Sequence, residues 1–245
     1  MSKPNPVAIA FWSYLAPISS SRALKWIVLS VIGILGMTLI GFFTGIIEQE
    51  ALADLRAVAI VPGLPVAAAL LSEMALRDGI THRTLLYPIL GPVSRTTLAI
   101  IRTTATALIL SAFALSTLIV LHVLSGRSWT NLPQELVAIV LGSFAYVCIF
   151  GLVHMWSKRG LVVALALFGI FDHSIGLLPF AIRKLSPSYY LRRLGDVEET
   201  LQIPIAIDME DASMIESALI LLLIAAVAMA ITAFLFRRKP LGELC

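Results

Sequence analysis

The sequence predicts an all-α integral membrane protein with six transmembrane helices and with both chain ends on the cytoplasmic side. Hydrophobic residues make up 59% of the 245-residue chain and charged residues only 13%, whereas a soluble domain carries about a quarter charged residues. The apolar residues gather in six runs of about 20 residues, the length that crosses a hydrocarbon core about 30 Å thick. The chain is therefore solvated mainly by lipid.

The six runs form one transmembrane domain over residues 26–236. They are residues 26–47, 56–76, 98–124, 135–156, 160–182 and 215–236. The second run is irregular because it contains Pro62 and Pro65, and proline removes a helical hydrogen bond. The fifth is irregular because it contains Asp172 and His173.

The loop charges predict the orientation. With the N-terminus inside, twelve of the 18 Lys and Arg residues fall on the cytoplasmic side and six outside, as the positive-inside rule requires. The basic cluster at 237–239 would lie outside if the number of spans were odd. We therefore expect six spans, a cytoplasmic tail over 237–245, and a bacterial-type cytoplasmic (inner) membrane as the location.

Two segments outside the spans are predicted to lie along the membrane surface. Apolar residues recur at helical spacing in residues 1–25, which favours a cytoplasmic interfacial amphipathic helix; a frayed apolar tail is the alternative. The extracytoplasmic loop 183–214 changes from basic to acidic along its length. Its segment 188–191, Ser-Tyr-Tyr-Leu, suggests an interfacial helix with an aromatic anchor.

Asp172 and His173 are ionisable residues inside a predicted span. A carboxylate near the centre of a helix costs about 2.5–3.5 kcal/mol on insertion scales, so such a residue is a functional candidate by default. One interpretation is a proton-linked or substrate-contacting pair. The other, which we favour, is a break in the span, because Gly169, Gly176 and Pro179 lie around the pair.

Other polar and small residues in the spans have two interpretations each. The hydroxyls of the third span either line a polar path or, more commonly, bond to the carbonyl one turn back. They are Thr103, Thr104, Thr106, Ser111, Ser116 and Thr117. Gly41 and Gly45 form a small-xxx-small step, which serves as a dimer seam or as packing within the subunit. His122 and His154 lie near span ends and are interpreted as interfacial or packing residues.

Several classes of chemistry lack their sequence signals. The chain contains no phosphate-binding Gly-x-x-x-x-Gly-Lys-Ser/Thr loop, no His-Glu-x-x-His pair, and no nucleophile and base at a known family spacing. It contains no Lys/Arg run of the kind that binds nucleic acid. Its two cysteines, Cys148 and Cys245, are too few for a zinc cluster. We expect no enzyme activity, no metal and no nucleic-acid partner.

The loop between the second and third spans, residues 77–97, is unusual because it carries an apolar patch between charged flanks. The patch consists of Leu85, Leu86, Tyr87, Ile89 and Leu90 and is broken by Pro88 and Pro92. Exposed apolar clusters usually mark an interface. The patch either docks into a groove on a soluble partner or lies flat among the lipid headgroups, and periodicity does not separate the two.

The residues in and around this loop resemble the signature of ABC type-2 permeases. They are Glu73, then Arg77-Asp78-Gly79, Leu85-Leu86, Pro92-Val93-Ser94-Arg95, and Arg102 seven positions later. The resemblance implies a six-span exporter subunit that dimerises, as a homodimer or heterodimer, and a re-entrant hairpin after the fifth span. It also implies coupling to separate ATPase subunits, which bind the ATP and Mg, through loop 77–97; this chain would bind no cofactor. The implied coupling residues are Glu73, Arg77, Asp78, Gly79, Leu85, Leu86, Tyr87, Pro92 and Arg95.

Three functional hypotheses follow. The first is the permease subunit of an ATP-driven ABC exporter. The second is a proton-coupled secondary transporter that uses Asp172 and His173. The third is a membrane anchor or assembly protein that transports nothing. We favour the first, because the resemblance to the ABC type-2 permease signature decides between the two interpretations of the loop.

Overall fold

Each apolar run of the sequence forms a helix, because a backbone in hydrocarbon must satisfy its hydrogen bonds internally. The computed structural model describes residues 11–12, 14, 22–45, 49–77, 94–125, 129–157, 159–176, 181–197 and 212–238, and within these ranges all regular structure is helical. The long elements are α2 (Arg22–Phe43), α7 (Arg95–Ser125), α8 (Leu132–Trp156) and α12 (Met214–Arg238). A further long helix joins α3 (Gln49–Val58), η1 (Ala59–Gly63), α4 (Leu64–Ser72) and η2 (Glu73–Arg77).

Among the described residues, four helices are long and apolar enough to cross a membrane. They are Asp54–Ala75, Arg95–Ser125, Leu132–Trp156 and Met214–Arg238. Their ends lie within three residues of the predicted second, third, fourth and sixth spans. The prediction of an all-helical, multi-pass membrane protein is therefore confirmed.

The helices at the first and fifth predicted spans differ from the expected boundaries. α2 is 22 residues long and lies about one turn earlier in the chain than the expected run 26–47, so residues 22–25 belong to α2 rather than to a separate N-terminal helix. In the fifth run the described apolar helix covers Gly160–Gly176 and rises about 26 Å, residues 177–180 lie outside the described residues, and residues 181–182 belong to a 3-10 turn. A bilayer crossing by these two helices, and with it the count of six, stays a prediction.

Two π-helical turns explain the irregular spans. Pro62 lies inside η1 and Pro65 is the second residue of α4, yet the helix continues from Gln49 to Arg77. A π-helical turn tolerates the loss of the hydrogen bond that proline cannot donate. Asp172 lies in a second such turn, η3 (Leu167–His173), which joins α9 (Gly160–Ala166) to α10 (Ser174–Gly176).

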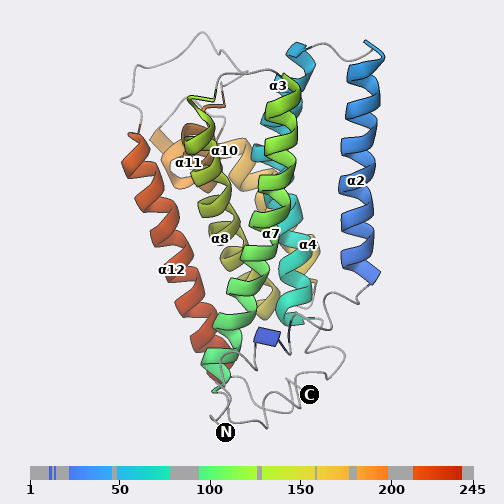
Figure 1. Ribbon diagram of the computed structural model, residues 1–245. Helices are drawn as coiled ribbons and strands as arrows, with labels where there is room; N and C mark the ends of the chain where they lie inside the picture. The colour runs from blue at the N-terminus through green and yellow to red at the C-terminus, as the bar shows by residue number, and fades with distance from the viewer. Residues whose placement is uncertain are drawn as a thin grey trace, which may run out of the picture.

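α8 is the central helix of the bundle and packs against α4, α7, α9, α11 (Pro187–Leu194) and α12 (Figure 1). Its small residues permit this close packing. At Gly142, an added Cβ would lie 2.7 Å from a methyl of Leu191 and 2.8 Å from a methyl of Leu64. α2 stands at the edge of the bundle and contacts α7.

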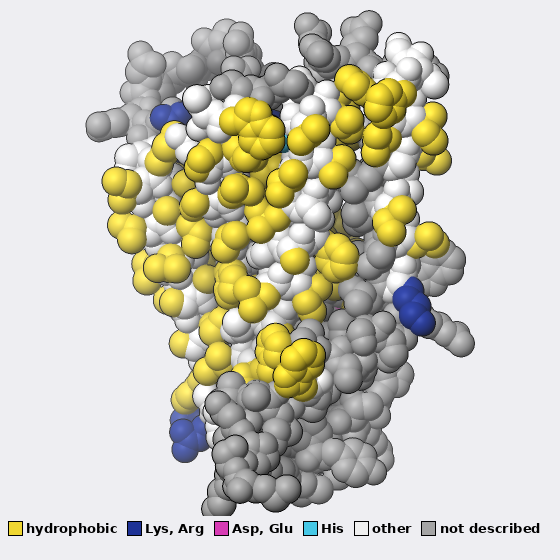
Figure 2. All heavy atoms as spheres, in the orientation of Figure 1, with side chains coloured by type: hydrophobic (Ala, Val, Ile, Leu, Met, Phe, Trp, Pro, Cys, Tyr) yellow, Lys and Arg dark blue, Asp and Glu magenta, His cyan; other side chains and the backbone are white. Residues whose placement is uncertain are grey.

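The two ends of the bundle differ in structure. α2 and α7 begin, and α12 ends, at one end (Figure 1), which we call the Arg95 end. At the other end, the α11 end, η4 (Ala181–Leu185) leads into α11, which packs on α8 and α12. Figure 2 shows hydrophobic side chains over the face between these ends and basic side chains only at its margins. Such a face suits contact with lipid.

The turn from α8 into α9 depends on the absence of a side chain at Gly160. An added Cβ would lie 2.9 Å from the Cα and 2.2 Å from Nδ1 of His154, so the backbone itself would have to move. At Gly169, in the same helix, a Cβ would meet nothing within 4 Å.

We expect Gly160→Ala to lower the free energy of unfolding by about 1–3 kcal/mol through overpacking. Gly169→Ala should leave it unchanged or raise it by up to about 1 kcal/mol, because alanine favours the helix. Thermal unfolding of the two purified variants in detergent measures the difference. Equal melting temperatures for both would contradict the packing described at Gly160.

Candidate functional site

The residues that resemble a permease coupling loop begin and end on helices at the Arg95 end. Glu73 lies in η2, whose last residue is Arg77, and Arg95 is the first residue of α7. Ser94 caps α7, because its Oγ accepts a hydrogen bond from the Thr97 backbone amide at 3.1 Å. The Ser-Arg step of the motif is thus a helix start. Asp78, Gly79, Leu85, Leu86, Tyr87 and Pro92 lie outside the described residues.

Arg102, the last residue of the motif, is buried in α7 near the Arg95 end. Its guanidinium lies over the ring of Tyr14, 5.0 Å from the centroid, and its Nη1 donates to the Ala75 carbonyl at 3.3 Å. The Tyr14 and Thr106 hydroxyls are 2.6 Å apart. Because the Thr106 hydroxyl donates to the Arg102 carbonyl, Tyr14 must be the donor to Thr106.

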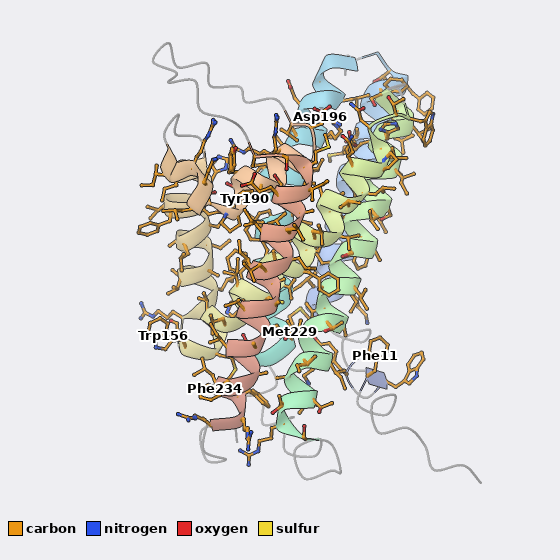
Figure 3. The ribbon with its side chains drawn as sticks, turned by 90° about the vertical axis from the view of Figure 1, so that its left-hand side faces the viewer. Phe11, Trp156, Tyr190, Asp196, Met229 and Phe234 are labelled. Atoms are coloured by element: carbon orange, nitrogen blue, oxygen red, sulfur yellow. The ribbon has the colours of Figure 1, made fainter. Side chains whose placement is uncertain are left out.

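Tyr14 therefore docks the described part of the N-terminal segment onto the bundle. It packs in an apolar cluster with Leu98, Met155 and Phe236, and Figure 3 places Phe11 at this same end. Burial raises the pKa of Tyr14 to about 12, against the smaller opposing effects of Thr106 and Arg102. The hydroxyl stays protonated and keeps its donor role at physiological pH.

Asp172 joins η3 to the start of α11. Its carboxylate accepts hydrogen bonds from the Tyr146 hydroxyl at 2.6 Å, from the Ser188 backbone amide at 3.0 Å, and from the Ser186 hydroxyl. Since the Ser188 amide is in the first turn of α11, Asp172 acts as a helix cap supplied by another element. Beside it, Nη2 of Arg192 lies 3.2 Å from Nδ1 of His173.

A second buried charge cluster lies at the α11 end and was not predicted. Arg56 of α3 forms an ion pair with Glu135 of α8, and both side chains are almost fully buried. Nδ1 of His122, from α7, lies 4.0 Å from the second Glu135 oxygen, and the Trp129 ring lies beside the imidazole, with 5.0 Å between the centroids and 59° between the ring planes. No described residue hydrogen-bonds to the His122 ring. The three groups come from three helices, so no local spacing in the sequence signals them.

Three helices each carry two ionisable residues separated by an uncharged stretch. The separations are 17, 20 and 19 residues, which correspond to about 26, 30 and 29 Å along a helix. These lengths match a hydrocarbon core of about 30 Å. The pairs are Arg56 and Glu73, Arg102 and His122, and Glu135 and His154. The cluster residues Arg56, His122 and Glu135 thus lie at the level of one membrane boundary, and Glu73, Arg102 and His154 lie at the level of the other.

Two predictions on polar and small residues can be compared with the structure. Five of the six hydroxyls of the third span bond to a carbonyl about one turn back, so the more common of the two interpretations is confirmed for them. Gly45 lies beyond the end of α2 with a φ of 71°, where it ends the helix. Gly41 and Gly45 therefore do not form a step on one helix, and a dimer seam at Gly41 stays a prediction.

The fold and these clusters define the class of the protein: it is a multi-pass α-helical membrane protein. No family model matches the chain, and no match was found among curated proteins or solved structures. Within the described part of the chain, no group of three His, Cys, Asp or Glu side chains is placed to hold a metal.

Removing the Asp172 carboxylate should loosen α11. Asp172→Ala leaves the Tyr146 hydroxyl and the Ser188 amide without their acceptor, and we expect a loss of about 3 kcal/mol in the free energy of unfolding. Ser174→Ala, an exposed change two residues away, is the control and should be close to neutral. Thermal unfolding in detergent tests this, and an unchanged melting temperature for Asp172→Ala would show that the carboxylate does not hold α11.

Removing one partner of the Arg56–Glu135 pair should lower the free energy of unfolding much more than replacing both partners with apolar residues. Glu135→Ala removes the acidic partner of a buried guanidinium, for which we expect a loss of about 3–5 kcal/mol, or a drop of about 10 °C in melting temperature. The double variant Arg56→Met with Glu135→Leu should recover most of this loss. A double variant less stable than Glu135→Ala would show that the pair itself is strongly stabilising.

Proposed function

We propose that this chain is the permease subunit of an ATP-driven ABC exporter. It works as a dimer of two permease copies, identical or different, in a bacterial-type cytoplasmic membrane. Separate ATPase subunits bind the ATP and Mg, and they engage the permease through loop 77–97. The chain itself binds no cofactor and catalyses no bond-making step.

The single observation that carries the proposal is the resemblance of the residues from Glu73 to Arg102 to the ABC type-2 permease signature. The positions of its described residues support it. Glu73 and Arg95 stand at the ends of two helices that could cross a membrane, at the same end of the bundle. A loop that joins them there is in a position to meet a partner outside the membrane.

The charge distribution supports a cytoplasmic location for this loop. The Arg95 end carries Lys25, Arg95, Arg159 and the pair Arg237 and Arg238 at the described helix ends. By the positive-inside rule this end faces the cytoplasm, where ATP is present. The same rule puts α11 at the outer face, as a re-entrant or interfacial element would require.

Arg102 provides a route by which movement of the loop can reach the spans. Its guanidinium contacts Ala75, in the last turns of the second span, and Tyr14, in the N-terminal segment, while its backbone belongs to α7. A push on loop 77–97 during ATP-driven closure would therefore move η2, α7 and the N-terminal segment together. Rocking of these elements would open the path outward.

The contacts of Asp172 lend less support to a proton-coupled secondary transporter. The carboxylate accepts three hydrogen bonds that hold α11 in place, and a proton carrier must exchange such partners in each cycle. A membrane anchor that transports nothing would have no use for an apolar patch in a charged cytoplasmic loop. Both alternatives predict that no ATPase binds this loop.

The proposal predicts that the ATPase copurifies with the permease and that the apolar patch is needed for this. The double variant Leu85→Asp with Leu86→Asp should reduce the ATPase recovered with tagged protein by about thirtyfold or more, since each interface anchor contributes about 2 kcal/mol. Leu185→Asp is the control, because Leu185 is 78% exposed at the opposite end.

Both variants must elute from size-exclusion chromatography as the wild type does. Full recovery of the ATPase with the double variant would exclude docking through this patch. Absence of any ATPase from the wild-type preparation, when its gene is coexpressed, would exclude the proposed function itself.

A further inference from the structure

An apolar groove lies between the helix of the second span and α7, with Ile139 of α8 behind it. Its volume is about 380 Å³. Every lining side chain is apolar except Thr117, whose hydroxyl donates to the Phe113 carbonyl at 2.9 Å. The groove therefore offers no free polar group to a ligand or to water.

The spacing of large and small residues explains the shape of the groove. Along the second span, five lining residues lie four positions apart. They are Leu55, Ala59, Gly63, Ala67 and Leu71. Residues at this spacing share one face of a helix. Small side chains at Ala59, Gly63 and Ala67 leave the space open, and Leu55 and Leu71 close its two ends.

On the second span the groove extends from Leu55 to Leu71, about 24 Å along the helix axis, so it starts at the level of Arg56 and passes the middle of the bundle. On α7 it extends from Leu110 to Leu121, about 17 Å along the helix axis, and half of a hydrocarbon core is about 15 Å thick. The uncharged stretch of α7 between Arg102 and His122 has its middle at Ala112. On α7 the groove thus occupies the half nearer to the α11 end, and on the second span it continues past the middle.

A groove of this kind inside a bilayer must be filled by hydrocarbon. Water does not fill a purely apolar cavity, and an empty one would forfeit the dispersion contacts of all its lining atoms. We propose that the groove binds one acyl chain of a bilayer phospholipid from the leaflet at the α11 end. The glycerol end of the lipid then lies level with Trp129, whose ring is 60% exposed, as expected of an interfacial tryptophan.

This inference needs only that the bundle is embedded in a membrane, and it does not depend on export or on an ATPase. It predicts that a lipid chain lies between the second and third spans in the resting protein. Ala114 lines the groove, whereas Ala112, at the same depth on the same helix, is exposed and does not line it. Tryptophan substitution at these two positions therefore separates filling of the groove from a general effect of a large side chain in lipid.

Photo-crosslinking tests the proposal with the full-length protein. The protein is placed in nanodiscs that contain a phosphatidylglycerol with a diazirine in the middle of one acyl chain, irradiated, and digested for mass spectrometry of the adducts. We expect adducts on the groove-lining residues of α4 and α7 in excess over the exposed leucines Leu222 and Leu223 of α12. Ala114→Trp should reduce the groove adducts by about tenfold, because the indole occupies the space that the chain needs, and Ala112→Trp should leave them unchanged.

Two results would overturn the proposal. Adducts spread evenly over the groove and α12 would show that the groove holds no chain more firmly than the rest of the surface. Labelling of α12 without labelling of the groove would show that protein fills it, either α2 of the same chain or a second copy. If Ala114→Trp unfolds, Ala67→Leu from the opposite wall, which fills the same space with a smaller side chain, replaces it.

Discussion

A polar group buried in hydrocarbon finds no partner except the protein itself, and this constraint accounts for most of the structure described. Inside the spans, hydroxyls bond to the carbonyl one turn back, as Thr103 does. The Arg56 guanidinium is paired with the Glu135 carboxylate, and Asp172 accepts three donors. On the three helices that carry Arg56 and Glu73, Arg102 and His122, and Glu135 and His154, the uncharged stretch is about 26–30 Å long, which matches the thickness of a bilayer core.

The polar groups at the two levels also hold the helices together. At the α11 end, Arg56, His122 and Glu135 link α3, α7 and α8. At the Arg95 end, His154 of α8 lies 3.0 Å from the Ala69 carbonyl of α4, and since a carbonyl only accepts, its Nε2 carries the proton. Between the levels, packing is mostly apolar and depends on small residues such as Gly142, and the Tyr146 hydroxyl of α8 donates to Asp172 there. Polar contacts thus hold the helices of the bundle together near both of its ends.

The start of α7 is also held to its neighbours by a buried polar side chain, Arg102. Arg102 contacts both Tyr14 and Ala75, so the N-terminal segment, the end of the second span and the start of the third form one unit beside loop 77–97. Arg102 lies about two turns into α7 and is the residue through which these three elements meet. A mutation at Arg102 would act on three elements together, whereas a mutation in the loop would act on one surface.

Periodicity and charge in the sequence were enough to determine the helical class and the positions of the second, third, fourth and sixth spans, because a bilayer sets both the length and the polarity of a crossing segment. They did not determine that the helix continues through Pro62 or ends at Gly45, since π-helical turns and left-handed glycines depend on local geometry. Only the tertiary structure brought Asp172 to Ser188 and Arg56 to Glu135. Partners on separate helices meet through packing, and no spacing along one helix predicts that.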